Sequence, residues 1–327
     1  MSFPDDTRAP ASAPAELQAG LPDEAGGQAS ARGYGAHTVW RSSMRPANSA
    51  EAGGTYAGCI DAGQPYAGRS DTDLIASEIP VALEFNGISH ATLLATPCDL
   101  EDFAYGFSYT EGIIRSASDI YGVDIVEKAS GIVVQLDIAS ACLHGLKLRR
   151  RSLAGRTGCG LCGLESLDEV RRSLPALPAP AACFSPEAIT RAASELLSMQ
   201  ALHQATGATH AAGWANLEGA VLQVREDVGR HNALDKLIGH MLRNAVSPRD
   251  GLAMVSSRAS FEMVQKAAAA GIGALVAVSA PTSYAAQVAQ ELNVLLAGFA
   301  RGGNFTVYSH PEYLGPVQAP NSPWSQP

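Results

Sequence analysis

Four short runs rich in apolar residues occur in the first half of the chain, and each run predicts a strand. The runs occupy residues 80–85, 88–94, 120–126 and 132–138, and short apolar runs bounded by turn residues are typical of strands. Asn86 and Gly87 separate the first two runs and form a strong hairpin signal. Residues 96–103 indicate a turn into a helix that continues to Gly112. These elements predict a small α+β unit over residues 71–150.

After residue 185 the pattern changes to strands that alternate with helices. Ser185 and Pro186 suit the cap and first position of a helix. Strands are predicted at residues 220–224, 252–256, 274–278 and 305–308, and helices at 232–242 and 260–270. A further helix is expected from Pro281 through Val288 and Leu292 to Leu295. This alternation predicts an α/β layered domain over residues 185–315.

The remaining segments have the composition of connectors. Residues 1–70 are mainly Ala, Gly, Ser, Pro and Asp, and such a segment cannot bury enough apolar surface to offset its ordering entropy. We therefore expect a disordered extension, with order beginning near Asp71 and Cys59 as an incidental thiol. Residues 151–184 are expected to form a mobile loop and a proline-rich connector, and the Pro- and Ser-rich residues 316–327 a disordered tail.

Two cysteines in the connecting loop are the first candidate for chemistry. Cys159 and Cys162 are separated by two residues and lie among Gly158, Gly160 and Gly163, and glycines bring no side chain to shield the sulfur atoms. Positive charge lowers the pKa of a thiol. Five basic residues precede the pair, and no Asp or Glu lies between Asp137 and Glu165; the basic residues are Lys147, Arg149, Arg150, Arg151 and Arg156. The loop is therefore predicted to be a reactive sulfur site.

Other uses of the cysteine pair must be weighed against this interpretation. A zinc site needs about four ligands, and none of the other cysteines forms a second Cys-x-x-Cys pair, although a dimer could pool two pairs. A dithiol redox motif normally follows an apolar strand, whereas basic and polar residues precede Cys159. A zinc deaminase requires His-x-Glu and a Pro before the pair, and neither His90 nor His144 fits. A reactive thiol and a zinc shared across a dimer both stay open.

Polar or glycine-rich runs follow four predicted elements of the second domain, at residues 226–232, 256–260, 279–283 and 298–304. Arg230 and His231 could hold phosphate with the first N–H groups of the next helix, and Phe299 could stack on a planar base. If the runs gather at one sheet edge, they form a pocket for a phosphorylated ligand. Any single run could instead be a capped helix start with solvated charges.

Three other polar residues have simpler interpretations. His210 is either a base or oriented donor, or a buried histidine with satisfied hydrogen bonds. Glu262 and Lys266 lie four residues apart on a predicted helix and are interpreted as a surface pair.

Composition narrows the class of protein. The chain has 327 residues, of which 46% are hydrophobic, and a formal net charge of −9, which argues against non-specific nucleic-acid binding. No apolar run reaches the roughly 20 residues that span a bilayer, and residues 1–6 do not resemble a signal peptide. Six cysteines without a regular framework favour a reducing compartment. We expect a cytoplasmic protein without a membrane or nucleic-acid partner.

The motifs, taken in order, resemble the formate dehydrogenase accessory sulfurtransferases, the FdhD family of sulfur carrier proteins. The resemblance extends from about Glu78 to Pro311 and excludes the extension before Asp71. It rests on the cysteine pair and on segments 86–87, 96–100, 106–107, 111–112, 210–214, 226–236, 256–265, 280–283 and 298–304. It implies a three-layer α/β/α main domain like that of cytidine deaminases without the zinc site, a smaller N-terminal α+β subdomain, and a homodimer.

The resemblance also implies an activity. A cysteine desulfurase would load a persulfide onto Cys159, with Cys162 as its partner. The sulfur would then pass to the molybdenum bis(molybdopterin guanine dinucleotide) cofactor before its insertion into formate dehydrogenase. The cofactor-binding segment implied by the family is Phe299, Ala300, Arg301, Gly302, Gly303 and Asn304.

We hypothesise that Arg230, Arg258 and Arg301 contact phosphate, with His231 beside them, and we expect no permanently bound metal. The alternative function is a non-catalytic scaffold that binds the cofactor and holds a zinc shared by the cysteine pairs of a dimer.

Overall fold

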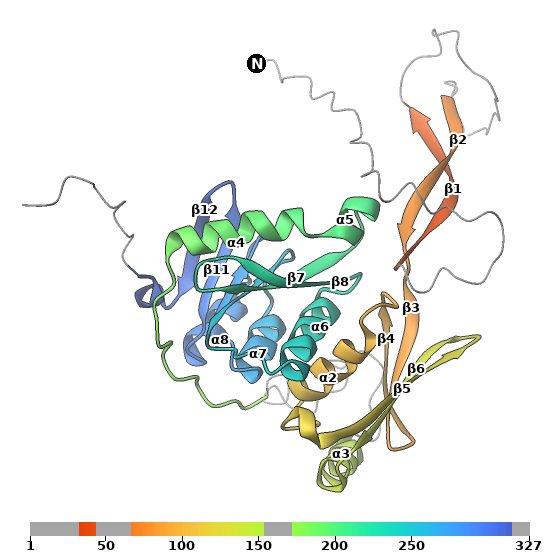
Figure 1. The fold of residues 1–327 in the computed structure, drawn as a ribbon, viewed down its shortest axis with the longest axis horizontal. Helices are drawn as coiled ribbons and strands as arrows, with labels where there is room; N and C mark the ends of the chain where they lie inside the picture. Colours follow the sequence, from red (N-terminus) through yellow and green to blue (C-terminus); the bar gives the residue numbers. More distant parts are fainter. Residues whose placement is uncertain (1–32, 44–66, 154–171, 316–327) are drawn as a thin grey trace, which may run out of the picture.

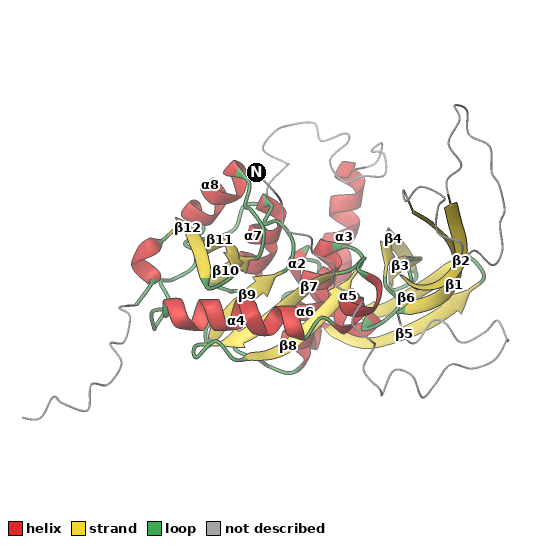
Figure 2. Cartoon of the chain, turned by 90° about the horizontal axis from the view of Figure 1, so that it is seen from above, coloured by secondary structure: helices red, strands yellow, loops and turns green. Residues whose placement is uncertain are grey.

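The computed structural model describes residues 33–43, 67–153 and 172–315 (Figure 1). They form a six-stranded sheet with helices on both faces, a four-stranded sheet with its own helices, and a two-stranded ribbon. Figure 2 shows the ribbon beside the four-stranded sheet and away from the larger one. The described part of the chain contains no helix long and apolar enough to span a membrane. The architecture is therefore mixed α/β, as predicted.

The six-stranded sheet has the strand order β12-β11-β10-β9-β7-β8. Strands β9, β10 and β11 are parallel, and β7 is antiparallel to both β9 and β8, so β8 runs in the same direction as β9. Strands β9 and β10 are buried throughout, as parallel strands covered on both faces should be. The strands are β7 (His210–Asn216), β8 (Val221–Asp227), β9 (Gly251–Val255), β10 (Ala274–Ala277), β11 (Leu295–Arg301) and β12 (Asn304–Ser309).

Helices cover both faces of this sheet (Figure 1). Helix α4 (Pro186–Ser198) packs on one face, where Ile189 joins a core with Met254 and Val276. The opposite face carries α6 (Arg230–Arg243), α7 (Phe261–Ala269) and α8 (Ser283–Glu291). Ser185 caps α4 by accepting the Ala188 N–H at 3.0 Å, which confirms that predicted start; the short α5 (Ala201–Thr206) follows. The further likeness to cytidine deaminases stays a prediction.

The four predicted strands of the first half form the smaller sheet. Its order is β4-β3-β6-β5, made of β3 (Ile79–Phe85), β4 (Ile88–Ala95), β5 (Ile120–Lys128) and β6 (Gly131–Ile138). Asn86 and Gly87 join β3 to β4 with φ values of 48° and 77°, which the predicted two-residue hairpin turn requires. Helix α2 (Leu100–Thr110) and α3 (Ser140–Leu153) complete this subdomain, with Phe85 and Phe103 in its core.

Helices α2 and α6 cross so closely that their backbones are in contact, and this crossing joins the two units. A Cβ added at Gly106 would lie 1.7 Å from the carbonyl oxygen of Asp235, and one added at Gly239 would lie 1.8 Å from that of Asp102. Only glycine permits so close an approach. The crossing therefore fixes how the smaller subdomain sits on the larger one.

The expected disorder before Asp71 is wrong for part of the extension. Strand β1 (Tyr34–Ser43) pairs antiparallel with β2 (Ala67–Ala76). Arg41 reinforces the pairing, because its guanidinium lies 2.8 Å from Asp71 and 3.0 Å from Asp73. The mean composition of residues 1–70 does not indicate a short segment within it that can pair with residues after it. The rest of residues 1–66, including Cys59, and the tail at 316–327 lie outside the described residues.

The end of the chain also differs from prediction. The last helix ends at Glu291 rather than Leu295, because Asn293 adopts a left-handed φ of 57° that no α-helix continues through. Leu295 instead begins β11, so the predicted turn at 298–304 contains the end of that strand. Helix α3 also extends to Leu153, past the expected boundary at 150.

Candidate functional site

The carboxyl ends of β8, β9, β10 and β11 lie at one edge of the six-stranded sheet. The four polar runs therefore share this edge, which is the condition under which the sequence predicts a pocket for a phosphorylated ligand. Backbone hydrogen bonds join neighbouring runs: the Phe299 N–H donates to the Ser279 carbonyl (3.1 Å), and the Thr282 N–H to the Ala259 carbonyl (3.0 Å). Ligands of open α/β sheets bind at this kind of edge.

An ionic group occupies the part of the edge near β8. His231 Nε2 lies 2.9 Å from Glu262 Oε2 and links the starts of α6 and α7. His231 holds the pKa of the Glu262 carboxyl below its ordinary value. Burial, and then the nearby Arg230 guanidinium, lower the pKa of His210. The surroundings therefore favour the neutral imidazole of His210, with the Arg230 guanidinium as the nearby cation.

Arg230 has an unused donor. Its Nε is buried and has no hydrogen-bond partner among the described residues. A buried donor without a partner is uncommon in native proteins and calls for an explanation. Arg258, at the next junction, is exposed. Together these two arginines give the edge donors suited to phosphate.

Phe299 is held in a conformation that side chains rarely adopt. Its φ is 54°, at an irregularity in the β11–β12 pairing, and the residue is 41% exposed. The left-handed region costs a non-glycine residue roughly 1–2 kcal/mol, and such strain clusters at functional sites. The strand end thus presents an aromatic ring to solvent at the edge.

The neighbours of Phe299 complete a tight turn. Ala300 is buried, while Arg301 is exposed. Gly302 and Gly303 have φ values of 59° and 76°, and Asn304 Nδ2 donates to the Gly302 carbonyl at 3.0 Å. All six residues assigned to cofactor binding by resemblance therefore lie in one hairpin at the edge.

A buried ion pair that the sequence did not indicate supports the edge. Lys236 and Asp227 are both fully buried, with Nζ 2.7 Å from Oδ2. Asp227 also accepts the Thr96 N–H at 3.0 Å, and Lys236 Nζ donates to the Thr96 carbonyl at 2.9 Å. Since Thr96 follows β4, the pair attaches the smaller subdomain to the end of β8.

Lys266 is buried, so its predicted role in a surface pair with Glu262 is wrong. Its Nζ lies 2.9 Å from Asp235 Oδ2 and 2.9 Å from Glu111 Oε1, and it donates to Thr110 Oγ1 at 3.0 Å. Burial alone would lower the pKa of Lys266, but the two carboxylates raise it above the ordinary value. Tertiary partners far away in sequence replace the expected neighbour.

Cys159 and Cys162 lie outside the described residues, as does Arg156. Where the description resumes, the Arg172 N–H donates to Gln265 Oε1 on α7 at 2.9 Å. Cys98 Sγ lies 3.9 Å from Lys236 Nζ, and burial raises the pKa of this thiol. Among the described residues, no group of three or more His, Cys, Asp or Glu residues could hold a metal ion.

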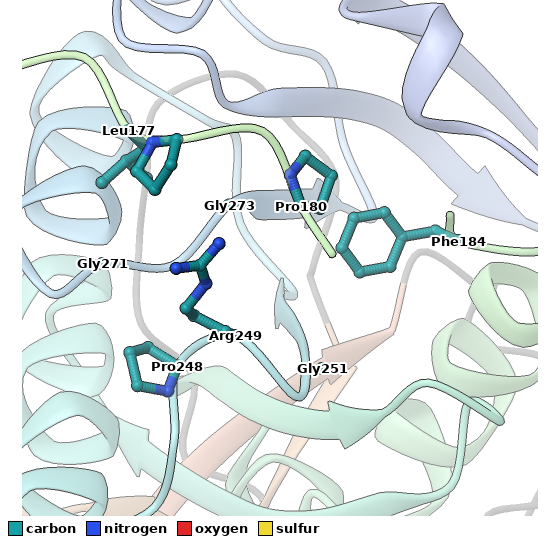
Figure 3. A pocket seen from close by; sticks show the side chains of 9 residues that line it. Leu177, Pro180, Phe184, Pro248, Arg249, Gly251, Gly271 and Gly273 are labelled. Atoms are coloured by element: carbon teal, nitrogen blue, oxygen red, sulfur yellow. The ribbon is translucent and has the colours of Figure 1, made fainter. Parts of the chain in front are cut away.

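A cavity of about 240 Å³ lies at the opposite edge of the sheet (Figure 3). Gly251, at the start of β9, and Gly273, just before β10, place it at the amino ends of these strands. Leu177, Pro180 and Phe184 give it an apolar lining. It is therefore separate from the edge that carries the polar runs.

Comparisons with known proteins agree on one family. The model of the FdhD/NarQ family matches residues 76–314. The sulfur carrier protein FdhD of Bordetella petrii is 59% identical over 245 residues, which cover 75% of this chain and 88% of the relative. That of Variovorax paradoxus is 54% identical over 247 residues, covering 76% and 88%.

The fold has a counterpart among solved structures. The crystal structure of a candidate formate dehydrogenase accessory protein from Desulfotalea psychrophila matches with a TM-score of 0.59 and 22% identity, over 85% of this chain and 99% of that one. This likeness concerns the fold alone. The extent of the family match and the identity to its members show that the chain belongs to the FdhD/NarQ family.

Proposed function

We propose that this protein is a sulfur carrier that acts in the maturation of formate dehydrogenase. The observation that carries the proposal is the identity of 54–59% to relatives named sulfur carrier protein FdhD. These alignments cover 88% of each relative. The soluble-type composition and the free thiols of Cys98, Cys142 and Cys183 suit the reducing cytoplasm.

Cys159 is the sulfur acceptor in this proposal. Its thiolate attacks the outer sulfur of a persulfide on a cysteine desulfurase, so that one S–S bond forms as the donor S–S bond breaks. The donor cysteine leaves as a thiolate and takes up the proton that Cys159 lost. In the delivery step the Cys162 thiolate attacks the inner sulfur atom, that of Cys159. A Cys159–Cys162 disulfide forms as the S–S bond of the persulfide breaks, and the outer sulfur leaves as hydrosulfide toward the receiving substrate. A small-molecule or protein thiol of the cell then reduces the disulfide to two thiols. The basic residues before the pair favour the attacking thiolate.

The sheet edge is the proposed site for the receiving substrate, the molybdenum bis(molybdopterin guanine dinucleotide). Arg230, Arg258 and Arg301 would contact phosphate, with His231 orienting the α6 start and Phe299 stacking on a base. The unused Arg230 donor and the strained, exposed Phe299 support this assignment. We further propose a homodimer with a cytidine-deaminase-like main domain.

Sulfur loading is tested by intact mass after incubation with a cysteine desulfurase and cysteine. We expect a gain of one sulfur atom that a reductant reverses and that Cys159→Ala abolishes, while Cys98→Ala retains it. Full loading of Cys159→Ala would exclude this residue as the carrier. An unchanged mass together with tightly bound zinc would favour the scaffold alternative.

The substrate site is tested separately by guanine-nucleotide affinity. Arg301→Ala should weaken binding of GDP, whereas Arg191→Ala should leave it unchanged. Arg191 is an exposed arginine on α4, where it pairs with Glu195 at 2.7 Å. Equal affinities for wild type and Arg301→Ala would remove Arg301 from the proposed pocket.

A further inference from the structure

Helix α3 presents one of its faces to solvent at the outer end of the smaller subdomain (Figure 1). Its inner face packs on the core of that subdomain, where Leu146 is buried and Leu143 partly buried. On the opposite face His144 and Lys147 are exposed, and Leu148 is 51% exposed. These three residues lie together because positions three and four apart share one face of a helix. They form a basic and apolar surface, the α3 face.

The α3 face belongs to a basic segment of an acidic protein. The formal net charge of the chain is −9, yet the residues between Asp137 and Glu165 include five Lys or Arg and no Asp or Glu. Lys147 has no ion-pair partner among the residues that the structure describes, so no neighbouring carboxylate neutralises its charge. A local charge of this sign attracts an acidic protein surface and repels a basic one.

The same helix leads to the proposed sulfur acceptor. Helix α3 ends at Leu153, and Cys159 follows six residues later. Six residues span at most about 22 Å, and Leu148 lies about 8 Å from the helix end. Cys159 is therefore within about 30 Å of the α3 face, which is about the width of the patch of roughly 800 Å² that one partner buries in a standard interface. A protein bound to the α3 face can thus reach Cys159.

We propose that the α3 face is the docking surface for the protein that donates sulfur to Cys159. The donor presents acidic side chains to His144 and Lys147 and an apolar side chain to Leu148, beside its own persulfide. This inference rests on the proposed function, because it assigns the binding surface for the sulfur donor of that same reaction. A docking residue changes how often the donor binds, and it leaves the transfer of sulfur from the bound donor unchanged.

The test measures the rate at which Cys159 gains sulfur, by intact mass, from a cysteine desulfurase supplied with cysteine. At about 50 mM salt Lys147→Glu should lower the second-order rate constant by about 3- to 10-fold, a part of the roughly 10- to 1,000-fold that a complete steering field provides. The rate at saturating donor should stay unchanged. At about 0.5 M salt the difference should shrink, because salt shortens the Debye length. Lys147→Arg keeps the charge and should load as wild type does.

Two controls separate docking from other effects. Lys128→Glu makes the same charge change on an exposed lysine at the turn end of the β5–β6 hairpin, whereas α3 starts from the open end of that hairpin, and it should load as wild type does. Glutathione persulfide delivers sulfur without a docking protein, so Lys147→Glu and wild type should accept it at equal rates. Leu148→Ala should raise only the desulfurase concentration that gives the half-maximal rate.

Each outcome decides a different claim. If the desulfurase loads Lys147→Glu, Leu148→Ala and wild type equally, the docking surface is wrong and the carrier function survives. A smaller mass of Leu148→Ala in light scattering would then assign the face to a second copy of the chain, and weaker sedimentation of Lys147→Glu with phosphatidylglycerol vesicles would assign it to a membrane. Equal slowing with both sulfur donors would also overturn docking, because Lys147 would then act on the reactivity of the Cys159 thiol. If wild-type Cys159 accepts sulfur from neither donor, the proposed function and this inference both fail.

Discussion

Replacement of Lys266 by methionine tests whether the buried ionic network stabilises the joint between the two subdomains. The substitution keeps most of the apolar stem and removes an ammonium group whose Nζ lies 2.9 Å from Asp235 Oδ2 and 2.9 Å from Glu111 Oε1. The side chain of Asp235 is only 2% exposed, so water cannot replace the lost partner. Thr110 Oγ1 would remain as a donor at 2.7 Å.

The expected magnitude follows from that burial. Removing one partner of a buried ion pair costs about 3–5 kcal/mol, because the other charge is left without compensation. Urea denaturation of Lys266→Met should show a loss of this size. Adding Asp235→Asn should recover part of it, with a coupling energy of about 1–3 kcal/mol in a double-mutant cycle.

An exposed pair provides the control. Arg191 and Glu195 have side chains that are 52% and 34% exposed, and Arg191→Met should cost at most about 0.5 kcal/mol. A loss below about 1 kcal/mol for Lys266→Met, within the range of exposed pairs, would refute the reasoning. It would mean that water or a rearranged side chain satisfies Asp235.

Two further predictions concern the same joint. Gly106→Ala should destabilise the protein by about 2 kcal/mol or more, because its Cβ would meet a backbone oxygen at 1.7 Å. Gly145→Ala is the control: it has open space around it and should stabilise α3 by about 0.5–1 kcal/mol. Equal melting temperatures of the two variants would contradict the close crossing. Burial, and then Arg225, lower the pKa of His240, so the unfolded state binds more protons below its own pKa of about 6.5. This contribution to the free energy of unfolding should therefore be fully present above that pH and fall on acidification through the folded-state pKa. Urea denaturation at pH 7 and pH 5.5 should show a larger loss of stability between the two pH values in wild type than in His240→Gln. The same loss in both proteins would contradict the assignment.

Local sequence patterns predict an element correctly where neighbours in sequence determine its structure. Asn86 and Gly87 predict the hairpin turn because they readily adopt the backbone angles of a two-residue turn, and Ser185 predicts the start of α4 because its side chain can cap the helix. The apolar run that begins at Leu295 fits a helix or a strand equally well. The left-handed Asn293 decides between them, and sequence periodicity does not show it.

The sequence places the four polar runs after predicted elements of the second domain, but it does not indicate the residues that contact them. Parallel strands bring their carboxyl ends to one edge, so Arg230 and Arg258 could be placed together from the sequence. Lys266 was misassigned because Asp235 and Glu111 lie 31 and 155 positions away. Nothing in a local pattern indicates such partners.

The buried charges give the smaller subdomain a direct influence on the candidate edge. Arg225 Nη2 lies 2.8 Å and Arg243 Nη1 2.6 Å from the Asp102 carboxylate, so α2 is fixed at its amino end by ion pairs. Near its other end Lys266 connects Glu111 to α6, and Thr96 is bound by the Asp227–Lys236 pair. The carboxylates of Asp102 and Asp235 are buried, so removing a basic partner leaves a buried charge with less compensation, at a cost of several kcal/mol. The two units therefore resist sliding past each other. The positions of Arg230 and His231 at the α6 start therefore depend on residues that precede them by more than a hundred positions.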